Sequence, residues 1–143
     1  MLFHILNKAH IHSLRKHEIL RRKQLISLLF RSGKSVKGDF LRVVYASFKP
    51  EHHFFQEVPA ILFAVSKKTL PSAVKRNRVK RMMREAYRLE KPLRKIDSEC
   101  LQDVGPVQML CIALLYLGRR ETLPDLPSFR EEIRGLMKSM ICS

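Results

Sequence analysis

The sequence predicts an α+β fold, a small sheet with helices packed on it, with its elements in the order α-β-β-α-β-α. The prediction rests on two segments rich in β-forming residues, a nearly continuous apolar run later in the chain, and amphipathic helix patterns around them. The chain has 143 residues, 45% of them hydrophobic, which is enough for one domain with a modest core. We divide it into a basic N-terminal arm, residues 1–15, and a single domain, residues 16–143.

The first half of the domain contains one predicted helix and two predicted strands. The helix covers residues 22–32 and ends at Gly33. Its expected buried face consists of Leu25, Ile26, Leu29 and Phe30. β-Branched and aromatic residues predict strands over Phe40–Phe48 and Pro59–Ser66. Because a polar, proline-containing stretch separates the two strands, we expect an antiparallel hairpin with a long loop.

A strongly cationic helix follows. Ser72 is its expected N-cap, and we expect it to end near Glu90, before Lys91-Pro92. Helical spacing predicts one buried stripe made of Val79, Met82, Met83, Ala86 and Tyr87. Against one acid, Glu85, the helix carries seven cations: Lys75, Arg76, Arg78, Lys80, Arg81, Arg84 and Arg88. Like charges four residues apart repel by a few tenths of a kcal/mol, so we expect an anion from outside the fold to compensate them.

The last part of the chain predicts a strand and a helix. Residues 91–106 form a polar connection, and the apolar run Val107–Leu117 is typical of a strand covered on both faces. A capping box from Ser128 to Glu131 predicts the start of the final helix. The inner stripe of that helix is expected to consist of Phe129, Ile133, Leu136, Met137 and Met140.

The charge distribution indicates a polyanionic partner. The net charge is +15, and bases and acids cancel over residues 101–143, so the excess lies in the first hundred residues. Nucleic acid is the usual partner of such a chain. No apolar run approaches the ~20 residues of a membrane span, and the polar start of the chain does not resemble a signal peptide; we expect no membrane partner. Cys100, Cys111 and Cys142 lack metal-ligand spacing, which favours a reducing, cytoplasmic location without disulfides, with Cys111 buried.

No catalytic or metal-binding constellation is evident in the sequence. The histidines are His4, His10, His12, His17, His52 and His53, and none is paired with a cysteine or carboxylate at zinc-site spacing. Phosphate-binding and nucleophile-elbow motifs are missing too. Asp39, Glu85 and Glu90 are too few for two-metal hydrolysis, and Glu85 is expected to pair with Arg81 or Arg88. If the protein takes part in catalysis, another component must hold the reactive metals.

Three segments resemble the signature of the bacterial ribonuclease P protein subunit: Ser66-Lys67-Lys68, Ala73–Arg81 with its Arg76-Asn77-Arg78 core, and Arg84-Glu85-Ala86-Tyr87. The likeness covers about residues 14–140. It implies that a large RNA holds catalytic magnesium and cuts the 5′ leader from precursor tRNA, while the protein binds that RNA and the leader; no cofactor is expected on the protein itself. It also implies a left-handed β-α-β crossover at the cationic helix, where the general rule predicts a right-handed one.

Carried over by position, the resemblance implies RNA contacts for Lys67, Lys68, Arg76, Asn77, Arg78, Lys80, Arg81, Arg84 and Arg88. Phe30 matches an aromatic residue of the leader-binding cleft, and Tyr45 is expected to be its second wall. Core packing is the alternative for these two aromatics, and a strand end is the alternative for Lys67 and Lys68. Ile26 stands where the family commonly has phenylalanine. Two rival functions remain open: a structural RNA-binding protein, and a DNA-binding regulator, although the pattern does not resemble a helix-turn-helix.

Overall fold

The computed structural model describes residues 14–48, 59–101, 109–118 and 122–142. These residues form a four-stranded sheet with three α-helices, which confirms the α+β class. In chain order the elements are η1 (Lys16–Glu18), α2 (Lys23–Ser32), β1 (Lys34–Lys37), β2 (Leu41–Phe48), β3 (Ala60–Ala64), α3 (Ala73–Leu101), β4 (Met109–Tyr116) and α4 (Leu126–Cys142). Two predicted segments lie outside the described residues: most of the arm (residues 1–13), with His4, His10 and His12, and the polar stretch 49–56 between the two predicted strands, with His52 and His53.

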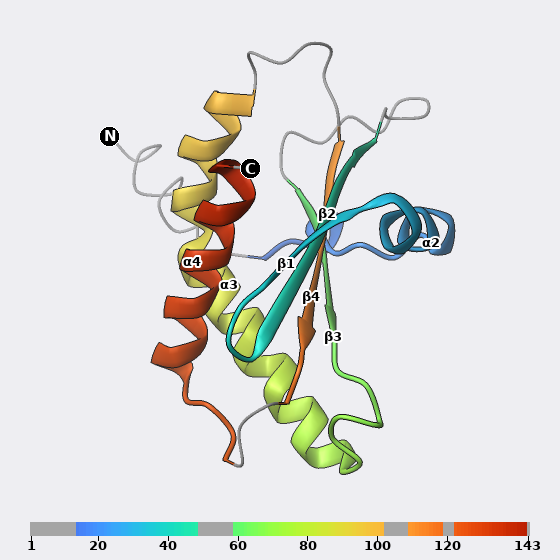
Figure 1. The fold of residues 1–143 in the computed structure, drawn as a ribbon, viewed down its shortest axis with the longest axis vertical. Helices are drawn as coiled ribbons and strands as arrows, with labels where there is room; N and C mark the ends of the chain where they lie inside the picture. Colours follow the sequence, from blue (N-terminus) through green and yellow to red (C-terminus); the bar gives the residue numbers. More distant parts are fainter. Residues whose placement is uncertain (1–13, 49–58, 102–108, 119–121, 143) are drawn as a thin grey trace.

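The sheet separates two apolar layers of unequal size (Figure 1). Helices α3 and α4 lie together on one face, and the short helix α2 lies on the other. Alternate residues of each strand supply the two layers: Val43 faces α3 and α4, and Val44 faces α2. Ahead of α2, the chain pairs Ile19 with Ile61 along the outer side of β3. No helix in the described part of the chain is both long and apolar enough to cross a bilayer.

The strand order is β1-β2-β4-β3, with β4 antiparallel to β2 and parallel to β3. The predicted hairpin between residues 40–48 and 59–66 is therefore wrong, because β4 lies between these two strands. The reason is burial: β4 is apolar on both faces, and only a central position covers both. Helix α3 connects the parallel neighbours β3 and β4, the β-α-β arrangement that the resemblance implies.

The predicted element order omits β1, which pairs antiparallel with β2 on the side away from β4. This strand is an edge strand of four largely polar residues, so its composition carries little strand signal; only Val36 packs on the core. The turn that joins it to β2 is anchored by α4: the carboxylate of Glu132 accepts hydrogen bonds from the backbone N–H groups of Asp39 and Phe40. Burial raises the pKa of Glu132 above its usual value, although these hydrogen bonds oppose the shift.

Helix α2 has nearly its predicted bounds and ends at Gly33, whose N–H donates to the carbonyl of Leu29. Leu29 is fully buried, and Leu25 and Ile26 are half-buried against the sheet. Phe30 was predicted on the buried face, but its side chain is 47% exposed. Successive residues turn by about 100° around a helix, and Phe30 is the one that this rotation carries past the edge of the buried stripe.

Helix α3 begins as predicted and ends later than predicted. The carbonyl of Ser72 accepts the N–H of Arg76 at 3.0 Å, and its hydroxyl accepts the N–H of Lys75 at 3.4 Å, so Ser72 is the cap. The prediction that the helix ends near Glu90 is wrong, since it continues past Lys91-Pro92 to Leu101. A proline removes one helical hydrogen bond, and the loss of that bond does not end this helix. Much of the predicted connection is therefore helical.

Helix α4 begins at Leu126, so its cap lies three residues before the predicted one. Its cap is Asp125, whose carboxylate accepts hydrogen bonds from the N–H and the hydroxyl of Ser128. Aspartate and serine are both good N-caps, so the sequence offers Asp125 as well as Ser128, and the capping-box pattern favoured Ser128. The predicted inner stripe is confirmed, and all five of its residues are buried: Phe129, Ile133, Leu136, Met137 and Met140.

Candidate nucleic-acid interface

The apolar stripe of α3 fixes which side of the helix faces solvent. Val79, Met83, Ala86 and Tyr87 are almost fully buried, as predicted, and the ring of Tyr87 meets Phe63 of β3 edge to face with centroids 5.7 Å apart. The remaining predicted stripe residue, Met82, is only half-buried. Because these contacts hold the helix against the sheet, its opposite side is presented to solvent in a fixed orientation.

That solvent side carries most of the predicted RNA-contacting residues. Over residues 73–90 of α3, whose side chains the structure describes, six polar side chains are exposed: Lys75, Asn77, Arg78, Lys80, Arg81 and Arg84. Within the described part of the chain, the five cations among them make no ion pair. Their mutual repulsion is therefore uncompensated inside the fold. A row of arginines is suited to bidentate contacts with phosphate oxygens.

Lys67 and Lys68 are exposed in the turn between β3 and α3. Since β3 ends at Ala64, they lie beyond the strand and do not terminate it. The hydroxyls of Ser66 and Thr69 bond to each other at 2.7 Å and tie the turn together. The two lysines thus extend the cationic surface past the start of α3.

Two of the predicted contact residues have intramolecular partners. Arg76 is half-buried, and its Nη1 donates to the carbonyls of Leu70 and Pro71, each at 2.8 Å. Arg88 pairs with Glu85 through two hydrogen bonds, one of them between Nε and Oε2 at 3.1 Å. This pair confirms one of the two partners expected for Glu85, and the hydrogen bond from Arg88 lowers the pKa of the Glu85 carboxyl. Arg76 therefore holds the turn before α3, and Arg88 stabilises the helix through Glu85, while both also add positive charge.

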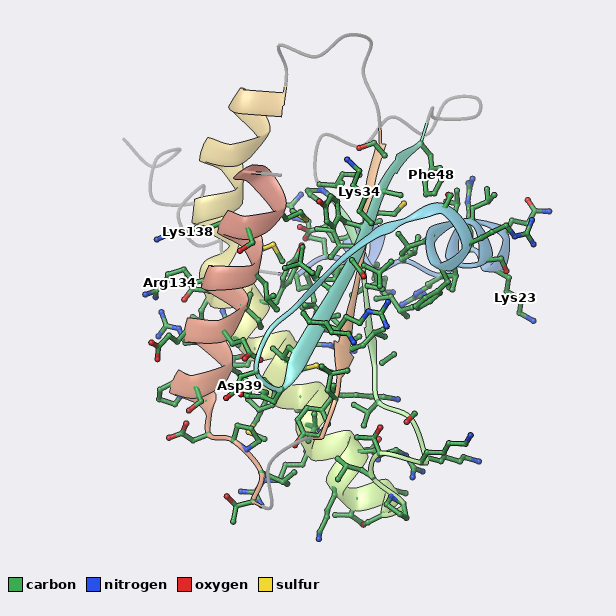
Figure 2. The ribbon with its side chains drawn as sticks, viewed as in Figure 1. Lys23, Lys34, Asp39, Phe48, Arg134 and Lys138 are labelled. Carbon is green, nitrogen blue, oxygen red and sulfur yellow. The ribbon has the colours of Figure 1, made fainter. Side chains whose placement is uncertain are left out.

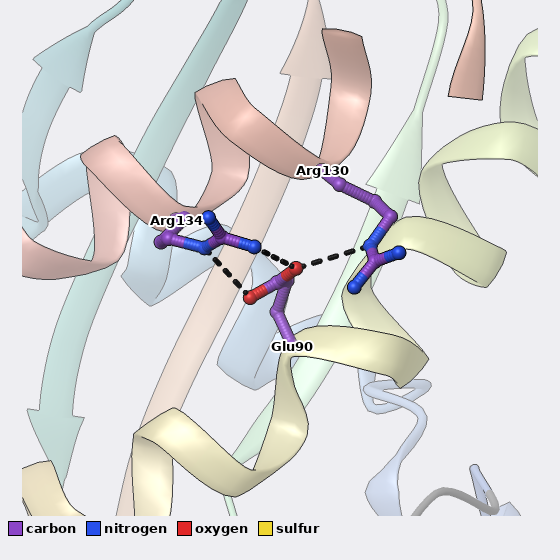
Figure 3. A network of polar contacts seen from close by, with 3 residues as sticks. All are labelled: Glu90, Arg130 and Arg134. Carbon is purple, nitrogen blue, oxygen red and sulfur yellow. Dashed lines mark hydrogen bonds and ion pairs between the residues drawn. The ribbon is translucent and has the colours of Figure 1, made fainter. Parts of the chain in front are cut away.

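A buried carboxylate fastens the far part of α3 to α4 (Figure 3). Glu90 is 4% exposed and accepts hydrogen bonds from Arg130 Nε at 3.1 Å and from Arg134 Nε and Nη2 at 3.1 and 3.0 Å. Burial alone would raise the pKa of Glu90, but the two guanidinium groups outweigh it and hold that pKa below its usual value. This contact was not predicted from the sequence. The features that could have indicated it are an acid in a cationic helix and two arginines four residues apart in α4.

The two aromatics predicted to wall a leader cleft do not face each other. Phe30 is exposed on α2, whereas Tyr45 of β2 is half-buried and packs on the core beneath α3 and α4, on the other face of the sheet. Leu28, missed by the sequence analysis, is also exposed on α2, and a groove of about 420 Å³ there is lined by Leu28, Lys23 and Arg31 among others. Figure 2 shows Lys23 extending from α2 on the side away from α4. Helix α2 therefore carries a second basic surface with exposed apolar groups.

The described residues contain no group of three or more His, Cys, Asp or Glu side chains placed to hold a metal ion. Cys111 is fully buried, as predicted, and burial raises the pKa of its thiol to about 11.

Comparison with known proteins identifies the family. Residues 14–102 match the model of the family described as Ribonuclease P. The chain belongs to the ribonuclease P protein family. It is 45% identical over 140 residues to the ribonuclease P protein component of Chlorobium phaeobacteroides, covering 95% of this chain and 93% of that protein. The corresponding protein of Chlorobaculum tepidum is 38% identical over 138 residues, covering 96% and 88%.

Solved structures of ribonuclease P proteins share the fold. The Staphylococcus aureus protein superposes with a TM-score of 0.60 at 16% identity, covering 86% of this chain and 94% of that one. The Thermotoga maritima protein gives 0.59 at 22% identity, covering 85% and 96%. The resemblance read from the Arg76-Asn77-Arg78 motif is thereby confirmed at the level of family and fold.

Proposed function

We propose that this protein is the RNA-binding subunit of ribonuclease P and assists a catalytic RNA in removing the 5′ leader from precursor tRNA. One observation carries the proposal: in a chain of this family, the exposed cations of α3 from Lys75 to Arg84 make no ion pair with any described residue, and the other side of the helix is fixed in the core. Structured RNA is bound chiefly through phosphates, 2′-hydroxyls and shape, and this surface offers charge in a fixed arrangement.

Arg78, Lys80, Arg81 and Arg84 are the central contacts in this proposal, with Lys67 and Lys68 extending the surface. Arg76 and Arg88 contribute charge while they brace the loop and the helix. Asn77 supplies a directional amide among these charges. Each phosphate neutralised releases condensed cations, so the affinity should fall by about 0.7–0.9 log units per contact for each tenfold increase in salt.

In this proposal, the RNA carries out the cleavage reaction. The nearby carboxylates Glu85 and Glu90 are engaged by arginines, which leaves them poorly suited to binding magnesium. The RNA would hold the magnesium ions, and the protein would neutralise phosphates and so lower the magnesium concentration that the RNA requires. A cytoplasmic location follows from this role.

The leader is assigned to the surface of α2. A single strand is held by aromatic faces, each worth roughly 1–3 kcal/mol per stacked base, together with cations along the backbone. Phe30 provides the exposed ring, and Lys23 and Arg31, which line the groove on the same helix, provide charge. Tyr45, which faces the core beneath α3 and α4, is left out of this surface.

The proposal is tested by adding the protein to ribonuclease P RNA at low magnesium and measuring cleavage of precursor tRNA. We expect cleavage to be stimulated by the wild-type protein. A structural RNA-binding protein would bind RNA with a similar salt dependence but would not stimulate cleavage, so binding without stimulation would reject the proposal in favour of that rival.

A further inference from the structure

A cleft with a volume of about 740 Å³ opens beside the first turns of α3, on the edge of the cationic surface. Its walls come from four parts of the chain: the turn before α3, the start of α3, the end of β4 and the segment that leads into α4. Sites for small organic groups typically have volumes of about 300–1,000 Å³. The cleft is therefore large enough for one nucleotide.

The walls of this cleft are held in place by contacts within the protein. The hydroxyl of Thr69 bonds to Ser66, and Arg76 bonds to the carbonyl of Leu70, so the turn before α3 is fixed at two points. Opposite this turn, Gly118 adopts φ +66°, and a Cβ atom at this position would lie 2.3 Å from Thr69 Cγ2. Glycine is needed here for both reasons. The close approach of Gly118 to Thr69 joins the two walls.

The lining of the cleft combines charge with apolar surface. Lys75 and Arg78 lie on the α3 side, one turn apart and both exposed. Leu70, Met82 and Leu123 supply apolar side chains that are only partly covered by the core. Among the described residues of the lining, the one carboxylate is that of Asp125, which caps α4 through Ser128. The cations suit a phosphate, and the apolar side chains beside them suit an aromatic base, so the lining matches the two parts of a nucleotide.

We propose that this cleft receives one unstacked nucleotide of the bound RNA. Its phosphate lies between Lys75 and Arg78, and its base rests on Leu70, Met82 and Leu123. The inference rests on the proposed RNA-binding function, because a phosphate backbone that follows the cations of α3 passes the mouth of the cleft. Proteins recognise single-stranded RNA by taking up splayed bases in this way. The positive charge of Lys75 and Arg78 favours RNA over a peptide as the occupant, because every nucleotide of RNA carries a phosphate.

Blocking the cleft tests the proposal. Thr122 is exposed and lines the cleft, so Thr122→Trp fills it without entering the core. We expect the affinity for ribonuclease P RNA to fall about tenfold, which equals about 1.4 kcal/mol. The control is Ser139→Trp, which places the same ring on an exposed position of α4, away from both the cleft and the exposed cations at the start of α3. We expect it to change the affinity by less than about twofold. Unchanged or tighter binding by the Thr122 variant would overturn the proposal.

Photocrosslinking gives an independent readout with the wild-type protein. With RNA that carries photoreactive thiouridine, we expect adducts on the peptides containing Leu70 and Leu123. Adducts confined to the outer faces of α2 and α3 would overturn the inference. Arg81→Ala separates this failure from that of the proposed function: if this variant loses affinity while Thr122→Trp does not, the cleft alone is rejected. If neither variant loses affinity, the RNA-binding function of α3 is rejected as well.

Discussion

Replacing Glu90 by glutamine should loosen the junction between α3 and α4. The variant keeps the size of the side chain but replaces one accepting carboxylate oxygen by an amide NH2 group, a donor that faces the guanidinium of Arg134 in either orientation. Breaking a fully buried ion pair costs about 3–5 kcal/mol. The two arginine side chains are 41% and 45% exposed and regain water when the pair is lost. We therefore expect the free energy of unfolding to fall by about 1.5–3 kcal/mol, less than for a fully buried pair.

Urea unfolding measures this loss, and its pH dependence checks the cause. Because folding lowers the pKa of Glu90, the carboxylate stabilises the protein above about pH 4.5, the ordinary value, and this contribution is lost as the pH falls through the folded-state pKa. The difference between wild type and Glu90→Gln should therefore be full at neutral pH and shrink in acid. The matched control is Glu85→Gln, which breaks an exposed pair with Arg88 and should cost less than about 1 kcal/mol. Equal stabilities of the two variants would refute the reasoning.

Three further predictions concern the surfaces and the core. Arg81→Ala should weaken RNA binding about five- to tenfold and reduce the slope of log affinity against log salt by about 0.7–0.9; an unchanged slope in a salt titration would contradict a phosphate contact. Phe30→Ala should weaken binding of precursor tRNA by about 1–3 kcal/mol without affecting mature tRNA, whereas Tyr45→Ala should instead lower the free energy of unfolding; equal loss with both tRNAs would remove Phe30 from the leader surface. The Cys111 thiol, buried and with a pKa of about 11, should react with thiol reagents only on unfolding, and rapid modification of the native protein, located by mass spectrometry, would contradict its burial.

Local signals in the sequence predicted the helices better than the sheet. The cap at Ser72, the end of α2 at Gly33 and the inner stripe of α4 each depend on residues within a few positions of one another. The pairing of β4 between β2 and β3 depends on contacts between distant segments, which no short pattern encodes. Strand β1 was missed because an edge strand needs few apolar residues.

In the candidate site, too, local features could be predicted from the sequence and contacts between distant segments could not. Its cations were visible in the sequence because charge pattern and helical period are local properties. The bracing roles of Arg76 and Glu90 were hidden, since their partners lie in a loop and in α4. Tyr45 was misplaced relative to Phe30 because the face of a strand residue depends on how the whole sheet is assembled. The charged residues could thus be identified from the sequence, whereas the structure was needed to show which of them are exposed and which have partners within the described part of the chain.

The most direct measurement of the central claim compares the wild-type protein with a variant in which Arg78, Lys80, Arg81 and Arg84 are all alanine. All four side chains are exposed, so the variant should fold, which circular dichroism verifies. With ribonuclease P RNA at low magnesium, we expect the wild-type protein to stimulate precursor-tRNA cleavage and the variant to lose that stimulation. Equal stimulation by both proteins would contradict the claim that the exposed face of α3 is what binds the catalytic RNA.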